Sequence, residues 1–259
     1  MRILTWNVNG LRAADRKGIS AAIESTGADV LLFQEVRATP DQLPREWVER
    51  AGWHAYWNPA EKLGYAGTAI ISREPIKIES IGLGGAGKNS DPEGRLVFAR
   101  IGPVRIACVY LPSGSSSEHR QVEKEKWMKR FRPWADAIVS SRVPTIMGGD
   151  FNIARTPLDI FHAKSNEKNS GFLPHERAWM DDLIASGWAD WTRESAGDAP
   201  GPYSWWSQRG NARALDRGWR IDYLLGNKAA SKKISGISTA RDLSLTISDH
   251  APVIADFDV

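Results

Sequence analysis

The sequence predicts a protein of the α/β class, built as one domain over residues 1–259. Short, continuous apolar runs such as residues 30–33 suit strands that are buried on both faces of a sheet. Stretches with a helical spacing of apolar residues, such as 117–139, lie between these runs. No repeat, low-complexity tract or linker divides the chain, so we interpret it as a single domain with a sizeable core.

The first part of the chain alternates between predicted strands and helices. Residues 2–8 alternate in polarity and break at the turn signal Asn9-Gly10, which predicts a strand. A helix over residues 18–25 should end at Gly27. The other elements expected here are a strand at 29–35, a helix at 40–50, strands at 53–57 and 67–72, and a polar loop at 88–94.

The second part of the chain continues this pattern. Residues 96–101 and 104–110 should form a hairpin around Gly102-Pro103. A long helix is expected over 117–139, and Pro133 should kink or interrupt it. The remaining expectations are a strand at 144–147 that stops at Gly148 and Gly149, a loop at 155–173, a helix at 175–186 ended by Gly187, and a last strand at 252–257.

Charge, cysteine content and the length of the apolar runs limit the partners and the cellular location that we expect for this protein. The net charge of +3 permits a polyanionic partner without demonstrating one. The single cysteine, Cys108, excludes an internal disulfide and a cysteine-rich metal site, and makes a reducing, cytoplasmic location the default expectation. The apolar runs are too short to cross a membrane, and the strand that starts at residue 2 leaves no room for a targeting segment. We therefore expect no membrane association.

Polar and acidic side chains collect at the ends of the predicted strands. In an α/β sheet the strand ends meet at one rim, where ligand sites form. The segment Asp150-Phe151-Asn152 alone is more typical of an Asx turn closing a loop, and Glu35 alone is equally consistent with a surface position. The full set is harder to explain by solvation: Asn7, Glu35, Tyr110, Asp150, Asn152, Asp222, Asp249 and His250.

These side chains suit phosphate chemistry. Carboxylate and amide oxygens favour a hard divalent cation, Mg²⁺ or Mn²⁺, over zinc, since the set contains no thiolate and little histidine. His250 adds an imidazole that can hold or protonate a phosphoryl oxygen. A metal, a base and an imidazole together predict phosphodiester hydrolysis.

Several blocks of the sequence resemble signature segments of the exonuclease III family of apurinic/apyrimidinic (AP) endonucleases, within the endonuclease/exonuclease/phosphatase superfamily. They are WNVNGLR at 6–12, QE at 34–35, GGDFN at 148–152 and SDH at 248–250. Two more segments, NEKNSGF at 166–172 and GWRIDY at 218–223, resemble the DNA-repair branch. Sphingomyelinases, inositol phosphatases and pancreatic-type deoxyribonucleases share the other blocks without these two.

The resemblance implies a four-layered α/β sandwich, in which two mixed β-sheets pack face to face and helices flank them. It also implies a Mg²⁺-dependent DNA repair enzyme, with Mn²⁺ as a substitute, that cleaves the DNA backbone 5′ to abasic sites. Expected side activities are 3′-phosphodiesterase or phosphatase action and 3′→5′ exonuclease action. The implied partner is double-stranded DNA with abasic sites or blocked 3′ ends, bound by a monomer.

The resemblance also assigns roles at the strand ends. Glu35 would bind the metal, with Asn7 and Asp249 near it. Asp150 would activate the attacking water or assist the leaving oxygen, although His250 is the alternative helper of the nucleophile. The residues implied in catalysis are Asp150, Asn152 to orient it, His250 paired with Asp222, Tyr110 at the scissile phosphate, and Asp249.

Residues outside the strand ends would recognise the DNA. Asn166 and Asn169 match residues that contact phosphate beside the lesion. Trp205, Trp219 and Ile221 match an apolar pocket for a flipped-out abasic sugar, which costs little to extrude because it has no base to unstack. Core packing is the alternative reading of the two tryptophans.

The chain departs from its relatives at two places, and two other functions stay open. Arg37 stands where relatives often have lysine, and residues 110–116 lack the basic residue that some relatives use to reach into DNA.

The catabolite repression control proteins, which are non-catalytic RNA-linked regulators, share the Leu-Pro-Ser-Gly turn of residues 111–114. Retention of the strand-end acids and of His250 argues against that function, and the tryptophan pocket argues against a nuclease indifferent to lesions.

Overall fold

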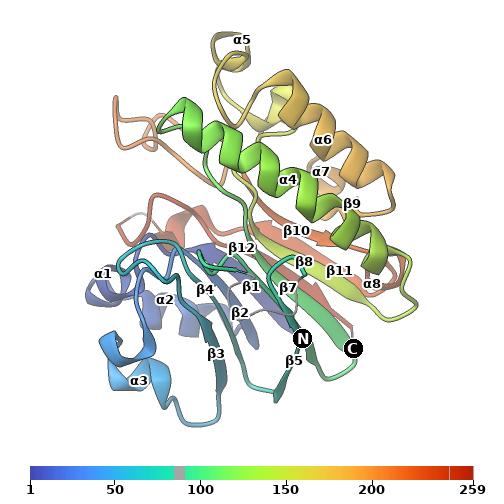
Figure 1. Cartoon of the computed structure of the whole chain (residues 1–259). Helices are drawn as coiled ribbons and strands as arrows, with labels where there is room; N and C mark the ends of the chain where they lie inside the picture. Colours follow the sequence, from blue (N-terminus) through green and yellow to red (C-terminus); the bar gives the residue numbers. More distant parts are fainter. Residues whose placement is uncertain (85–90, 245, 259) are drawn as a thin grey trace.

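The computed structural model describes residues 1–84, 91–244 and 246–258, and Figure 1 shows their arrangement. Within these residues, two six-stranded sheets pack face to face, with strand orders β11-β12-β1-β2-β4-β3 and β5-β6-β7-β8-β10-β9. Helices α1 to α3 cover the outer face of the first sheet, and α4 and α6 cover that of the second. This arrangement confirms the four-layered sandwich with two mixed sheets.

Each sheet contains one parallel pair among antiparallel strands at its centre. In the first sheet β1 runs parallel to β2 and antiparallel to β12. In the second sheet β7 runs parallel to β8, and β10 runs antiparallel to β8. The strands are β1 Arg2–Asn7, β2 Val30–Gln34, β3 His54–Asn58, β4 Thr68–Ser72, β5 Ile76–Ile81, β6 Leu96–Ile101, β7 Val104–Tyr110, β8 Thr145–Asp150, β9 Ala189–Asp190, β10 Asp222–Gly226, β11 Ile234–Thr239 and β12 Val253–Phe257.

Three helices confirm the predicted helical stretches, and the others are short. The long α4 begins after Ser117, whose side chain caps it, and α6 ends before Gly187. The α-helices are α1 Leu11–Arg16, α2 Ile19–Thr26, α3 Arg45–Val48, α4 Glu118–Val139, α5 Ala163–Asn166, α6 Pro174–Ala185, α7 Trp191–Ala196 and α8 Lys228–Ser231.

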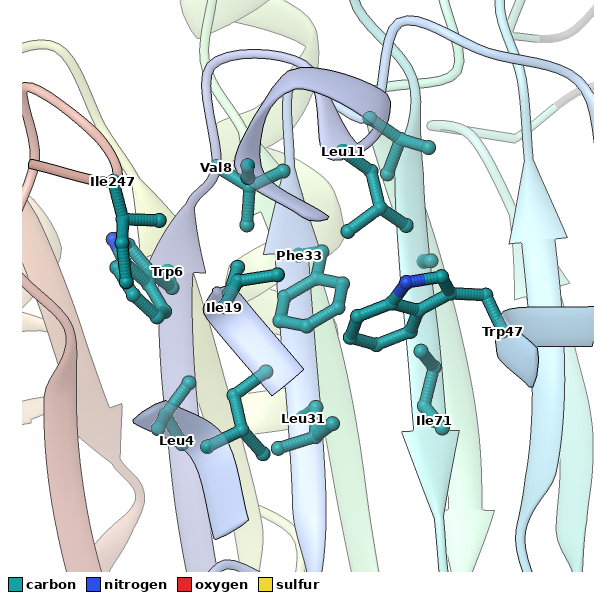
Figure 2. Packing of buried hydrophobic residues seen from close by; sticks show 14 of the residues in the cluster. Leu4, Trp6, Val8, Leu11, Ile19, Leu31, Phe33, Trp47, Ile71 and Ile247 are labelled. Carbon is teal, nitrogen blue, oxygen red and sulfur yellow. The ribbon is translucent and has the colours of Figure 1, made fainter. Parts of the chain in front are cut away.

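Apolar side chains fill the space between each pair of layers. Ile3 and Leu32 of the first sheet pack against Ile106 and Ile146 of the second. Outside the first sheet, Phe33 meets the ring of Trp47 edge-on, with 5.8 Å between ring centroids (Figure 2). Full burial of one such side chain contributes about 1.5–3 kcal/mol. The layers therefore form a rigid base for the strand ends.

One helix prediction is wrong in detail, and another is wrong as far as it expected an interruption. The helix expected at 40–50 is split, because Leu43 before Pro44 is extended and separates a 3-10 turn, Pro40–Gln42, from α3. Conversely, α4 runs through Pro133 without interruption. Pro133 lies on the exposed side of α4, and Phe131 and Ala135 anchor the helix to the second sheet on either side of it.

Two other expectations concern loops and membranes. Of the polar loop expected at 88–94, residues 88–90 lie outside the described residues, and 91–94 form a turn in which Gly94 donates to the Asp91 carbonyl. Among the residues that the structure describes, no helix has the length and apolar character to cross a membrane.

Candidate active site

The strand directions bring the predicted polar residues to one rim of the sandwich. β1 and β2 end side by side, with Asn7 opposite Gln34, and β7 and β8 end with Tyr110 opposite Asp150. β10 is antiparallel to β8 and begins at this rim, so Asp222 lies opposite Asp150. Asp249 and His250 precede β12, which also begins here because it is antiparallel to β1. Residues distant in sequence therefore meet at one place.

The glycines before Asp150 lie inside β8, so the prediction that the strand stops at them is wrong. A Cβ atom on Gly149 would lie 1.8 Å from the Val109 carbonyl oxygen of β7. A Cβ atom on Gly148 would lie 2.5 Å from the Leu32 side chain of the facing sheet. Glycine is thus required by close approach to the neighbouring layers, and the strand continues to Asp150 at the rim.

Asp150 is buried and hydrogen-bonded through both carboxylate oxygens. Its Oδ1 accepts from the backbone N–H of Asn152 at 2.8 Å, so the Asx turn is present within the site. Its Oδ2 accepts from the side-chain amides of Asn7 at 2.9 Å and Asn152 at 3.1 Å. Burial and repulsion from Asp222 raise the pKa of Asp150 to about 7. A carboxylate with this pKa can accept a proton near neutral pH.

His250 and Asp222 form a buried pair beside Asp150. The His250 Nδ1 lies 2.9 Å from Asp222 Oδ2. Burial alone would lower the pKa of His250, but Asp222, together with Asp150 and Asp249, outweighs burial and raises the pKa to about 10. The imidazole is therefore doubly protonated at neutral pH and can donate a hydrogen bond to an anion.

Glu35 lies at the end of β2 and is held from three sides. Its Oε1 accepts from Asn7 Nδ2 at 2.9 Å and from the Tyr110 hydroxyl at 2.7 Å. Its Oε2 pairs with the Arg37 guanidinium. Burial and the Glu35 charge raise the pKa of Tyr110 well above its ordinary value, so this phenol remains a donor. Glu35 itself has a left-handed backbone, with φ of 53°, which the surrounding contacts must maintain.

Asp249 precedes β12, which pairs with β1 on the side away from β2. Its Oδ1 accepts from Asn9 Nδ2 at 2.8 Å, and its Oδ2 accepts from Trp205 Nε1 at 3.2 Å. Burial would raise the pKa of Asp249, but His250 and these two donors outweigh it and hold the pKa below its ordinary value. Asp249 is thus an anion at neutral pH.

The donor atoms of the rim fit a hard divalent cation. They are carboxylate oxygens with amide and phenol groups around them, the kind of ligand set that Mg²⁺ prefers. Asp150, Asp222 and His250 present one ligand atom each within 4.8 Å of one another. His250 is cationic and already bonded to Asp222, so it is a poor ligand. Glu35 and Asp249 offer carboxylate oxygens that can bind a cation, although the Arg37 guanidinium is paired with the Glu35 carboxylate.

A cleft of about 1110 Å³ opens above these groups. Asn7, Tyr110 and Asp222 are buried and support residues that line the cleft from beneath. Among the predicted site residues, those that line it are Glu35, Asp150, Asn152, Asn166, Asn169, Trp205, Trp219, Ile221, Asp249 and His250.

The cleft has an apolar wall and a polar wall. Trp205 and Trp219 meet edge-on with ring centroids 6.0 Å apart, and Ile221 packs beside them. Both tryptophans are half-buried, so each ring packs on the core and also lines the cleft. On the polar wall, the Asn169 Nδ2 donates to Asn166 Oδ1 at 2.8 Å, which fixes the two amides relative to each other.

Sequence reasoning missed several residues of the cleft. Asn9 served only as a turn signal, yet it binds Asp249 and lines the cleft. Its position two residues after Asn7, in the block of residues 6–12, is the signal that could have identified it. Lys168 and Arg209 also line the cleft and add positive charge there. Their exposed loops carry no periodic pattern that predicts their direction.

Comparisons with known proteins agree with this geometry. Residues 4–250 match the Endonuclease/Exonuclease/phosphatase family. An exodeoxyribonuclease of Bacillus subtilis (strain 168) is 33% identical over 262 residues that cover 98% of both chains. Two solved structures cover both chains fully with TM-scores of 0.88: an AP endonuclease from Archaeoglobus fulgidus at 25% identity, and a 3′ phosphatase from Neisseria bound to a product DNA hairpin at 27%. The chain therefore belongs to the Endonuclease/Exonuclease/phosphatase family, among its exonuclease III-type DNA repair nucleases.

Proposed function

We propose that the protein is a Mg²⁺-dependent AP endonuclease that cleaves the DNA backbone 5′ to abasic sites. We include 3′-phosphatase and 3′→5′ exonuclease action in the proposal, since relatives carry these names, and with them 3′-phosphodiesterase action on blocked 3′ ends. The observation that supports it most is the placement of the Asp150, Asp222 and His250 cluster at the floor of a cleft with an apolar wall. One cleft thus combines groups for phosphate hydrolysis with a surface for a sugar that lacks its base.

In the proposed reaction, Asp150 accepts a proton from the water that attacks the phosphorus atom. The bond between phosphorus and the 3′ oxygen breaks, and that leaving oxygen takes up a proton from solvent, which gives a 3′-hydroxyl end and a 5′-phosphate end. Its pKa of about 7 and its fixed position suit this role. Asn152 holds Asp150 by two hydrogen bonds and so orients it. The protonated His250 donates to a non-bridging phosphate oxygen, and Asp222 fixes the imidazole by accepting from Nδ1. The Tyr110 hydroxyl is a second donor within this part of the rim.

Glu35 and Asp249 would hold the metal ion, with Asn7 beside them. Asn7 donates its amide to both Glu35 and Asp150, so it sets the distance between the metal carboxylate and the base. When bound, Mg²⁺, or Mn²⁺ in its place, supplies a Lewis acid that stabilises charge on the phosphate and the leaving oxygen. The oxygen ligands favour these ions over zinc.

The walls of the cleft would select the substrate. Trp205, Trp219 and Ile221 offer an apolar pocket for an extruded sugar, and a nucleotide without a base loses no stacking when it leaves the helix. Asn166 and Asn169 would bind the phosphate beside the lesion. The partner in this proposal is double-stranded DNA with abasic sites or blocked 3′ ends, and a monomer in the cytoplasm would act on it.

The alternative functions lack support of this kind. A non-catalytic regulator would not need Asp150, Asp222 and His250 held in bonding geometry, and the comparisons give nuclease relatives. A nuclease indifferent to lesions would not need two half-exposed tryptophans in the cleft wall.

The proposal is tested with a DNA duplex that carries one tetrahydrofuran abasic analogue. We expect nicking 5′ to the analogue with Mg²⁺, none with EDTA, and none in an undamaged duplex. A third duplex with a 3′-phosphate end measures the end-trimming activity in parallel. Absence of nicking at the analogue, with the 3′ end still processed, would contradict the assignment as an AP endonuclease.

A further inference from the structure

Lys124 of α4 and Glu176 of α6 form an ion pair that is wholly buried and does not line the cleft. Their Nζ and Oε1 atoms lie 2.6 Å apart, and both side chains are 0% exposed. Burying two charges costs desolvation energy, and apolar residues often stabilise such a position equally well. The pair therefore calls for an explanation other than the packing of α4 on α6.

Lys124 contacts the backbone of a predicted catalytic residue. Its Nζ donates to the Asn152 carbonyl oxygen at 3.0 Å. Asn152 has a left-handed backbone, with φ of 51°, and this conformation lets its N–H and its side-chain amide both reach Asp150. The ammonium group thus holds the strained peptide on which the orientation of Asp150 depends.

Glu176 contacts the segment that carries the polar wall of the cleft. Its Oε2 accepts from the backbone N–H groups of Gly171 at 2.6 Å and Leu173 at 3.1 Å. The Gly171 φ is +91°, and a Cβ atom there would lie 3.0 Å from the Trp219 ring and 3.1 Å from the Asn152 carbonyl oxygen. Gly171 is therefore enclosed between the pocket tryptophan and the peptide that Lys124 holds.

We infer that Lys124 and Glu176 are positioning residues that fix Asn152 relative to the loop of residues 166–171, and thereby align Asp150 with the phosphate-binding wall. The inference rests on the proposed function, because it gives Asn152 and this loop their roles. Neither Lys124 nor Glu176 lines the cleft, so each acts through the backbone it holds.

The test compares two variants in the whole protein. Glu176→Gln keeps an oxygen that can accept from Gly171 and preserves the N-terminal cap of α6. Lys124→Met combined with Glu176→Gln removes both charges and also the contact to Asn152, so that no unpaired charge is left buried. We expect kcat on the tetrahydrofuran duplex to fall about 10- to 100-fold in the double variant and less in Glu176→Gln, while KM stays close to that of the wild type.

Glu125→Gln is the matched control. Glu125 and His175 form an exposed pair between the same two helices, 2.9 Å apart, and neither residue lines the cleft. This variant should keep wild-type kcat. Measuring kcat at several temperatures separates two causes of a loss. Misalignment of Asp150 lowers kcat at every temperature, whereas with partial unfolding kcat recovers on cooling.

A spectroscopic readout makes the result independent of cleavage. The Gly171 backbone and Asn152 side-chain amide signals in ¹H–¹⁵N NMR spectra should move in the double variant and stay in place in Glu125→Gln. A folded double variant with wild-type kcat and unmoved signals would overturn the inference, as would an equal loss of kcat in the control. If the wild-type protein does not cleave the duplex, the proposed function fails, whereas the amide signals still decide whether the pair holds these backbones.

Discussion

Asp150 and His250 lie in one buried cluster, yet their surroundings give them different protonation states. Burial and Asp222 raise the pKa of Asp150 to about 7. For His250, burial acts in the opposite direction but is outweighed by Asp222, which raises the pKa to about 10. Around pH 8, Asp150 is mostly ionised and His250 is still protonated. Pairs of groups separated in this way can act as base and hydrogen-bond donor in the same step.

Glu35 provides the most direct test of the metal site. Changing Glu35→Ala removes the carboxylate that Asn7, Tyr110 and Arg37 surround, so the Mg²⁺ concentration for half-maximal cleavage should rise by about tenfold or more. Cleavage rates over a Mg²⁺ titration measure it. Glu118→Gln, which alters another carboxylate lining the cleft, is the control. An unchanged titration for Glu35→Ala would remove Glu35 from the metal site.

Among the elements, β8 shows how a strand places a proposed catalytic group. Its glycines let β7 and the facing sheet approach closely, and this spacing sets the position of Asp150 beside Asp222 and Tyr110. The glycine pair resembles a turn signal in the sequence. The close contacts of these glycines with β7 and with the facing sheet show that the packing requires residues without a side chain.

Gly149→Ala should destabilise the fold more than an ordinary strand substitution. The new methyl group would overlap the Val109 carbonyl oxygen, so we expect a loss of about 3 kcal/mol or more of unfolding free energy. Urea denaturation measures it. Gly236→Ala in β11 is the control, since a Cβ atom there has ordinary contacts, 3.4 Å from Asp256. Equal stability of the two variants would show that β7 and β8 are not so closely packed.

Trp219 links the apolar wall to the rest of the cleft. It pairs with Trp205 and Ile160 through isolated bridges and touches the enclosed Gly171 position. Trp219→Ala should therefore lower kcat/KM on the abasic duplex by about 10-fold or more, with a smaller loss on a frayed 3′-phosphate end that needs no extruded sugar. Trp179→Ala, at a half-buried tryptophan outside the cleft, controls for general destabilisation. Equal losses on both substrates would make Trp219 a core residue only.

Across the whole chain, the buried strands and the strand-end residues could be predicted because buried strands leave a strong apolar pattern. The order of the strands within each sheet was not predicted. The runs at β2, β7 and β8 are continuous, and the polar groups directly after them were found. The prediction of two face-to-face sheets, and of the residues that line the cleft walls, came from the resemblance to the exonuclease III family. Asp222 was found with the other strand-end groups, although it begins β10, and the resemblance paired it with His250.

The elements that were not predicted are short or partly exposed. α1 is six residues long, and β11 alternates between half-buried and exposed positions with a bulge near Gly236. Such segments take their structure from neighbouring strands, so their own propensities carry little signal. The Lys124–Glu176 pair was also missed, because two charged residues in amphipathic helices normally indicate a solvated face.

A buried ion network supports the back of the apolar wall and makes stability depend on pH. Arg220 bonds to Asp190 through both terminal nitrogens and to Asp159 through Nε. Burial would raise the pKa of Asp159, but Arg220 and Arg193 outweigh it and hold the pKa below its ordinary value of 3.8. This contribution to stability is therefore fully present above the unfolded-state pKa and is lost as pH falls through the lower folded-state pKa.

Asp159→Asn should reduce this dependence. We expect the variant to be less stable than the wild type at pH 7, by about 3 kcal/mol, because part of the Arg220 charge loses its partner. The difference should shrink as pH falls below 4. Thermal unfolding from pH 7 to pH 2 measures both effects, with Asp181→Asn of the exposed pair with Arg155 as control. A difference that is constant with pH would contradict the assignment of charge to Asp159.

In the proposed mechanism, Asp150, at the floor of the cleft, is the group that removes the proton from the attacking water. The most direct measurement is single-turnover cleavage of the tetrahydrofuran duplex by Asp150→Asn with Mg²⁺, beside DNA binding in EDTA. We expect the cleavage rate to fall about 10²- to 10⁴-fold with binding unchanged, because asparagine keeps the shape but cannot accept the proton. A cleavage rate within a few-fold of the wild type would show that Asp150 is not the base.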